Sequence, residues 1–212
     1  SSAAGTFNLM ADANNVGGGS SGVGQLRILN SAFLEVRATA LSRLYLSAAD
    51  VIVTSSVTPW LNASLLSTDA ELHLTTSNSS SSSLLVHGDD LTLDATYGSL
   101  ASSSLQLSQQ ELNGVLTSSI LVLGGVTTSQ LVLENIVYQP ATSPSLIRLQ
   151  SEASASSTLQ VILSPIYFQS AVLMSARADI QLAANVTVNS VLNVAADSDC
   201  TGSGALTLLN DM

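Results

Sequence analysis

The sequence contains no lysine, and five arginines supply all of its positive charge against 15 acidic residues. The net charge at pH 7 is therefore −10. Because proteins bind nucleic-acid phosphates through clustered Lys and Arg, this balance excludes nucleic acid as an expected partner. It also disfavours attachment to an anionic membrane surface.

Long apolar runs and cysteine pairs are missing as well. No segment reaches the roughly 18 consecutive apolar residues of a membrane-spanning helix. The opening residues have neither the basic start nor the apolar block of a signal peptide. The single cysteine, Cys200, excludes a disulfide-stapled small domain. We interpret it as a free thiol, with a cross-link to another chain or to a segment outside this sequence as the alternative.

Charged residues make up only 9% of the chain and aromatic residues 4%, whereas hydrophobic residues make up 46%. A soluble domain usually has about 25% charged residues, so solubility must come from other polar groups. Serine, with 37 residues, is the candidate. The 212 residues are enough for one large domain or for a piece of a longer array.

Apolar residues recur as couplets separated by one residue. Such a period of two is the signature of β-strands, whose alternate side chains face one side of a sheet. The polar segments between the couplets are rich in Ser, Thr, Asn, Asp and Gly, which favour turns. The couplets include Leu26/Ile28, Leu34/Val36, Leu44/Leu46, Val51/Val53, Leu72/Leu74, Leu84/Val86, Leu91/Leu93, Leu105/Leu107, Leu121/Leu123, Leu131/Leu133, Ile147/Leu149, Leu159/Val161, Val172/Met174 and Leu206/Leu208.

About twenty short strands with few aromatic anchors favour an all-β solenoid over a sandwich or barrel. Ile180/Leu182, Val186/Val188 and Leu192/Val194 repeat every six residues, which is the spacing of left-handed β-helices. Elsewhere the spacing varies, so we predict a right-handed parallel β-helix with roughly ten coils and a length of about 50 Å. Residues 1–212 would form one such domain, part of a longer chain or filament, with a flexible Gly/Ser loop at 14–24 and a Ser-rich loop at 77–83.

The stretches "DIQLAANVTVNSVLNVAADSD" (179–199) and "ADVIVTSS" (49–56) resemble repeats of secreted right-handed β-helix proteins of the filamentous-haemagglutinin and adhesin type. The resemblance implies an extracellular or cell-surface fibrous stalk. No binding-site motif of that class matches, so no site residue is carried over.

The stretch "HGDDLTLD" is the strongest candidate for catalysis. It contains His87, Asp89, Asp90 and Asp94. Paired carboxylates on the outer face of a β-helix can cleave glycosides, one as acid and one as base. The dipeptides His-Gly and Asp-Asp faintly resemble motifs of the polygalacturonase family. Their order and spacing differ from those of that family, and no Arg-x-Lys motif follows. A solvated turn is the preferred interpretation, with a cation site as a second alternative.

Metal-binding candidates are few. Asp197 and Asp199, beside glycines, have the alternation that suits Ca²⁺, but the complete Ca²⁺-loop pattern is absent, and a corner turn is preferred. His73 is predicted to face outward as an isolated histidine, and two histidines are too few for an expected zinc site. We expect no cofactor.

Three sequons for N-glycosylation occur at Asn62, Asn78 and Asn185. The leading hypothesis is a structural or adhesive extracellular glycoprotein that associates with itself end to end into fibres or filaments and contacts surface glycans. The alternative is a carbohydrate-active enzyme, a polysaccharide hydrolase or lyase, that uses the region from His87 to Asp94.

Overall fold

The structure is a computed structural model. It describes residues 6–10, 25–29, 34–36, 43–48, 50–54, 65–67, 71–76, 82–87, 104–108, 112, 115–117, 119–140, 143–161, 165–202 and 204–209. Nearly all of this backbone lies in short β-strands and the turns between them, which confirms the all-β prediction for the described part of the chain. No helix among these residues is long and apolar enough to cross a membrane.

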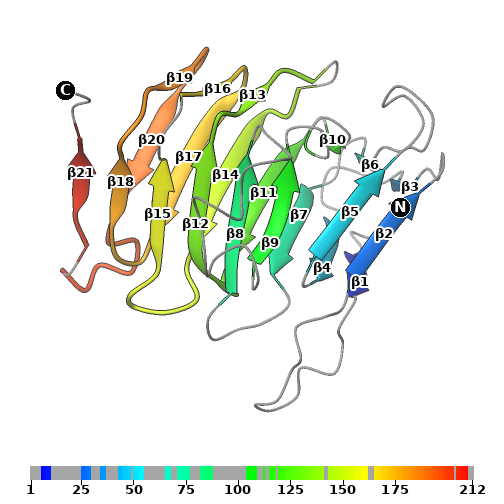
Figure 1. Ribbon diagram of the computed structural model, residues 1–212, viewed down its shortest axis with the longest axis horizontal. Coiled ribbons are helices and arrows are strands. Elements are labelled where there is room, and N and C mark those ends of the chain that lie inside the picture. Colours follow the sequence, from blue (N-terminus) through cyan, green and yellow to red (C-terminus); the bar gives the residue numbers. More distant parts are fainter. Residues whose placement is uncertain are drawn as a thin grey trace, which may run out of the picture.

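Seven strands form the longest sheet, the first sheet, and every neighbouring pair in it is parallel. The strands stack along the longest axis of the molecule, so segments far apart in sequence lie side by side (Figure 1). Along the sheet they are β1 (Thr6–Met10), β4 (Arg43–Ala48), β7 (Glu71–Thr76), β11 (Ile120–Gly125), β14 (Leu146–Ser151), β17 (Ala171–Ala176) and β20 (Leu192–Ala195).

A second sheet runs beside the first and is also parallel. At one end β5 lies next to β9, and β5 pairs in parallel with β2. The strands of the second sheet are β21 (Leu206–Leu208), β18 (Ile180–Leu182), β15 (Thr158–Val161), β12 (Thr128–Glu134), β8 (Ser82–His87) and β9 (Ser104–Ser108). The strands β5 (Asp50–Thr54) and β2 (Gln25–Leu29) form a separate two-stranded sheet.

Two shorter parallel sheets complete the set. One contains β13 (Val137–Tyr138), β16 (Ile166–Phe168) and β19 (Val186–Val188). The other contains β10 (Val115–Thr117), β6 (Leu65–Ser67) and β3 (Leu34–Val36).

From β11 onward the chain visits the sheets in a fixed order. A coil is one passage of the chain from the first sheet to the second, then to the sheet of β13, β16 and β19, and back to the first sheet. Leu121, Ile147, Val172 and Leu192 occupy one position in four successive strands. By the differences of these residue numbers, successive coils take 26, 25 and 20 residues. Among the described residues the first sheet has seven strands, against the roughly ten coils predicted for the whole chain.

The aliphatic couplets explain why these strands stack. Four of them occupy the same two register positions in adjacent strands, and each of their eight side chains is 0% exposed: Leu72/Leu74, Leu121/Leu123, Ile147/Leu149 and Val172/Met174. Fully burying one such side chain stabilises the fold by about 1.5–3 kcal/mol. Because each couplet has another above and below it, the interior stays dry along the stack.

The corner between β11 and β12 depends on glycine. Gly124 has a φ of +83°, which is in the left-handed region, and a Cβ added there would lie 2.1 Å from the carbonyl oxygen of Gln150. The next corner is made by Asn135, with a φ of 49°. Asn tolerates this conformation better than other residues with a side chain.

The order of strands in the second sheet departs from that of a regular solenoid. β8 pairs with β12 on one side and with β9 on the other, although β9 follows β8 in the chain. The chain therefore turns back toward β5 before it reaches β11. The predicted Ser-rich loop at 77–83 overlaps the start of β8, which begins at Ser82. The predicted loop at 14–24 lies outside the described residues.

Candidate functional site

The last coil exposes one apolar end of the stack. The name terminal coil is used for residues 179–209, which pass from β18 in the second sheet through β19 and β20 and return to the second sheet at β21. Leu192, Leu206 and Leu208 are 38%, 48% and 67% exposed. Ile180, which pairs in register with Leu206, is 0% exposed because it has a strand on each side. This aliphatic surface is called the end face.

The two aspartates predicted as a weak Ca²⁺ candidate lie in the loop between β20 and β21. Thr201 joins them, since its backbone N–H and its hydroxyl both donate hydrogen bonds to Asp197 Oδ1 (2.9 and 3.3 Å) and to Asp199 Oδ1 (3.3 and 3.0 Å). The backbone N–H of Gly202 donates to Asp197 Oδ2 at 2.8 Å. The carboxylates thus hold the loop closed, as the predicted corner turn requires.

The hydrogen bonds also set the acidity of Asp197. Partial desolvation raises its pKa, but the hydrogen bonds that its carboxylate accepts from Gly202 and Thr201 lower it, and the net result is a pKa below the ordinary value of 3.8. Asp197 itself has a φ of 59°, and the exposed, free Cys200 has a φ of 57°. The loop is therefore tightly wound around its carboxylates.

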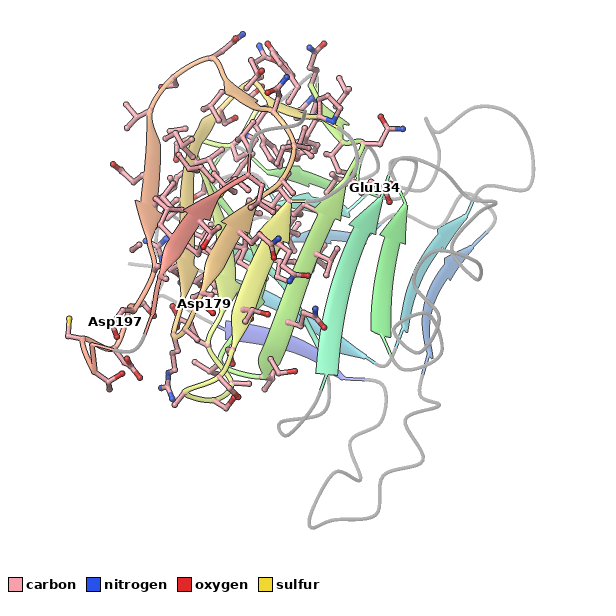
Figure 2. All side chains as sticks on the ribbon, turned by 60° about the vertical axis from the view of Figure 1, so that its left-hand side comes forward. Glu134, Asp179 and Asp197 are labelled. Carbon is pink, nitrogen blue, oxygen red and sulfur yellow. The ribbon has the colours of Figure 1, made fainter. Side chains whose placement is uncertain are left out.

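Asp179 connects the terminal coil to its neighbours. Its carboxylate accepts a hydrogen bond from the backbone N–H of Ala205 at 2.9 Å, and its carbonyl oxygen accepts one from Leu159 N–H at 3.0 Å. Asp179 and Asp197 lie toward the terminal-coil end of the molecule, away from Glu134 (Figure 2). Within the described residues no group of three or more His, Cys, Asp and Glu side chains could hold a metal ion.

A ladder of three glutamines, not predicted from the sequence, runs along the second sheet. Gln130 Nε2 donates to Gln160 Oε1 at 3.3 Å, and Gln160 Nε2 donates to Gln181 Oε1 at 3.3 Å. In register, Gln181 is followed by Thr207 of β21. Gln130, Gln160 and Gln181 are together called the glutamine ladder. In a parallel sheet, stacked side-chain amides can each donate to one neighbour and accept from the other.

The structure places His87 at the last position of β8, opposite Glu134 in β12. Asp89, Asp90 and Asp94, the carboxylates of the predicted catalytic stretch, lie outside the described residues. Sequence reasoning missed Glu134, which is 47 positions away from His87 by residue number. Only the strand register between β8 and β12 makes them neighbours.

His73 is mostly buried and has a carboxylate partner, which corrects the prediction of an isolated histidine. Its Nε2 lies 3.2 Å from Glu71 Oε2, two positions away on the same strand. Their side chains are 13% and 18% exposed. The neighbouring Leu72 and Leu74 point into the core, so the outward orientation was predicted correctly and the carboxylate partner was missed.

Of the three sequons, only Asn185 lies within the described residues. Asn185 and Thr187 are exposed, on either side of the more buried Val186. The carbonyl oxygen of Asn185 accepts a hydrogen bond from Ile166 N–H at 2.9 Å. The backbone of Asn185 is therefore fixed, while its side chain is accessible. Asn62 and Asn78 lie outside the described residues.

The chain was compared with family models, curated proteins and solved structures. None of them matches. Arguments about function therefore depend on the residues of this chain alone.

Proposed function

We propose that this protein is a structural or adhesive element that acts outside the cell as a rigid, right-handed parallel β-solenoid. The observation that carries the proposal is the stack of aliphatic couplets, buried in register through four successive strands. Such an interior resists bending, because any bend would separate rows of side chains packed at the density of a protein core.

The composition of the exterior supports the same role. With 37 serines and only 9% charged residues, the surface offers hydroxyl groups instead of charged patches. A hydroxyl-rich surface can hydrogen-bond to glycans without needing a deep pocket. Right-handedness is supported by the strong preference for right-handed crossovers between parallel strands and by coils of unequal length.

The shape and the location can be tested separately. Small-angle X-ray scattering of the 212-residue chain should give a rod-like pair-distance distribution, and circular dichroism should give a β spectrum. Antibodies applied to source cells should label them without permeabilisation. A compact spherical particle would contradict the solenoid, and labelling only after permeabilisation would contradict the extracellular role.

Glycosylation forms part of the proposal, and Asn185 is its accessible site. Secretion from a eukaryotic host should yield a protein whose electrophoretic mobility increases on treatment with an N-glycosidase. The Asn185→Gln variant should lose the part of the mobility shift that comes from a glycan on Asn185. Asn189→Gln is the control and should keep the whole shift, because Asn189 is exposed but is not part of a sequon.

The second candidate is a carbohydrate-active enzyme, favoured by the register of His87 opposite Glu134. The chain would be incubated with acidic and neutral polysaccharides, and reducing ends would be measured. Release of sugar by the wild type, lost in Glu134→Gln and in Asp90→Asn but kept in Glu152→Gln, would replace the structural proposal with the enzymatic one.

A further inference from the structure

The sheet of β13, β16 and β19 turns one face to the core and the other to solvent. Ile166 and Phe168 of the middle strand β16 are each 1% exposed and belong to the core, whereas Gln169, which follows them, is exposed. β16 has a neighbouring strand on each side, so this exposure comes from the face of the sheet and not from an edge. The three strands lie side by side at the top of the view in Figure 1.

Strand register arranges the outward residues of this sheet into two rows of three. The backbone bonds continue into the second row, because Gln169 N–H donates to the carbonyl oxygen of Tyr138 at 3.3 Å and Asn189 N–H donates to that of Phe168 at 3.1 Å. Each strand contributes one residue to each row, and every residue of the second row carries a side-chain amide. The six residues are together called the amide face: Val137, Tyr167 and Thr187 in the first row, and Gln139, Gln169 and Asn189 in the second.

The amide face carries no charge. None of the residues 136–140, 165–170 and 185–190 is Asp, Glu, Lys or Arg, although the net charge of the chain is −10. An anionic ligand would find no cation here to pair with, and a cationic ligand would find no carboxylate. An uncharged ligand is therefore the one that matches this face electrostatically.

The amides of the second row are available to a ligand. The side chains of Gln139 and Gln169 are exposed, and among the described residues neither side-chain amide has a hydrogen-bond partner. In the glutamine ladder, by contrast, the amide of Gln160 is bonded on both sides. A side-chain amide both donates and accepts hydrogen bonds, and so does a sugar hydroxyl. The exposed amides thus suit a ligand that is rich in hydroxyl groups.

Tyr167 adds an aromatic contact at the centre of the first row. Asn189 Nδ2 donates a hydrogen bond to the Tyr167 hydroxyl, which holds the ring in place and leaves the phenolic proton for a ligand. Beside it in register, Val137 is 51% exposed. The C–H groups of a sugar ring pack against aromatic and aliphatic surface of this kind. A ring that is fixed in advance also loses little entropy on binding.

We propose that the amide face binds a neutral polysaccharide that runs across β13, β16 and β19. The inference rests on the proposed adhesive role and names its surface and its ligand class. Neighbouring strands are about 4.8 Å apart, and each presents one amide. A chain of repeating sugars would therefore meet the same chemical group on three successive strands, and several weak contacts on one ligand add up to useful affinity.

Native affinity electrophoresis of the 212-residue chain tests the ligand class. Gels would contain galactomannan, xyloglucan, mixed-linkage β-glucan or dextran as neutral polymers, and polygalacturonate or alginate as acidic ones. We expect at least one neutral polymer to retard the protein and neither acidic polymer to do so. The protein is produced in bacteria, because an N-glycan on Asn185, which faces outward beside Thr187, would compete for the face.

Variants of the amide face test the site. Gln139→Ala/Gln169→Ala removes two exposed amides and should raise the dissociation constant for the retarding polymer by roughly fivefold or more. Tyr167→Ala should raise it by a similar factor through loss of the ring contact. Asn193→Ala is the matched control and should leave it unchanged, because it removes an exposed amide from β20 of the first sheet. Circular dichroism should give the same β spectrum for all of these proteins.

Side-chain amide signals in NMR spectra locate the ligand independently of any variant. On addition of oligosaccharides prepared from the retarding polymer, the amide signals of Gln139 and Gln169 should shift. Those of Gln130 and Gln160 in the glutamine ladder, on the second sheet, should stay in place.

The outcomes separate this inference from the proposed function. Absence of retardation by every neutral polymer, retardation by the acidic polymers alone, or equal binding of the wild type and the double alanine variant would each overturn the inference while leaving the extracellular solenoid intact. A compact spherical particle, or cell labelling only after permeabilisation, would overturn the proposed function, whereas the polysaccharide binding of the purified chain would still be measured on its own.

Discussion

The middle coils, residues 120–176, and the terminal coil are built from the same couplets but differ in how much of each couplet is buried. Val172 is 0% exposed and Leu192 is 38% exposed, although they pair in register on neighbouring strands. The side chains are similar, so the difference comes from whether a strand lies on both sides. Stability in this protein is therefore a property of adjacent coils and not of any one coil.

Polar groups at the corners find hydrogen-bond partners in both regions. In the middle coils Ser151 is buried, and its hydroxyl donates to the carbonyl oxygen of Thr128 in the neighbouring coil at 3.3 Å. In the terminal coil the carboxylate of Asp197 bonds to Thr201 and Gly202 of its own loop. The terminal loop thus adds internal partners to the bonds that it still makes to the preceding segment, from Asp197 N–H to the carbonyl oxygen of Ala178 at 3.2 Å and from Ser198 N–H to that of Ala176 at 2.9 Å.

The largest expected effect on the free energy of unfolding comes from truncating a leucine side chain in a middle coil. Leu149→Ala removes a fully buried side chain between Leu123 and Met174 and should lower the free energy of unfolding by about 2–5 kcal/mol. Leu208→Ala in the terminal coil should change it by less than about 0.5 kcal/mol, because Leu208 is 67% exposed. Urea unfolding measures both. Equal losses would show that the two regions are packed alike.

Two glycines with nearly equal φ give the next largest contrast. Gly124→Ala would force a Cβ to within 2.1 Å of a backbone oxygen in the neighbouring coil and should lower the free energy of unfolding by about 2–3 kcal/mol. Gly202→Ala, at φ +80°, meets nothing within 4 Å and should cost about 1 kcal/mol, from the backbone alone. Thermal unfolding of the pair checks this. A larger loss from Gly202→Ala would refute the neighbour-coil argument.

The glutamine ladder should contribute less than either packing effect. Gln160→Met removes two inter-strand hydrogen bonds and Gln181→Met removes one, at about 0.5–1.5 kcal/mol each. Methionine keeps the length of the side chain, so the loss reports on the amide. The free energies of unfolding of the two variants should differ by the contribution of one hydrogen bond. If both match the wild type, the ladder contributes nothing to stability.

The smallest effect is local and depends on pH. The pKa of Asp197 is lowered in the folded protein, so its contribution to loop stability is complete above the unfolded pKa and is lost as pH falls through the lower, folded value. Acid titration should therefore shift the NMR amide signals of Thr201 and Gly202 below pH 3.8. In Asp197→Asn the Gly202 signal should lose this titration, because its N–H donates to Asp197 Oδ2, whereas Thr201 keeps its bond to Asp199. An unchanged titration in the variant would exclude Asp197 as its source.

Much of the fold could be predicted from the couplets, because a period of two determines which side chains face inward. Ile180/Leu182, Val186/Val188 and Leu192/Val194 were expected to be three strands, and they form β18, β19 and β20. The course of the chain between β7 and β11 could not be predicted. The couplets Leu84/Val86 and Leu105/Leu107 are alike in sequence, and nothing in them indicates that β9 lies on the β5 side of β8.

The candidate site was predicted less well than the fold. Asp197 and Asp199 were recognised as a corner from their glycine neighbours, and the structure adds Thr201 as the group that joins them. Glu134 and Gln160 gave no local signal. Their partners are set by strand register, which depends on the length of the intervening corners, and single-sequence patterns do not determine that length.

The corners of the coils vary in length while the strands keep their alignment. Coils of 26, 25 and 20 residues place Leu121, Ile147, Val172 and Leu192 in one row. Extra residues in a corner therefore leave the strand pairing of the first sheet unchanged. Foreign peptides inserted at successive corners would accordingly be displayed in a line at the strand repeat of about 4.8 Å. The corners thus offer positions for short peptides at this fixed interval.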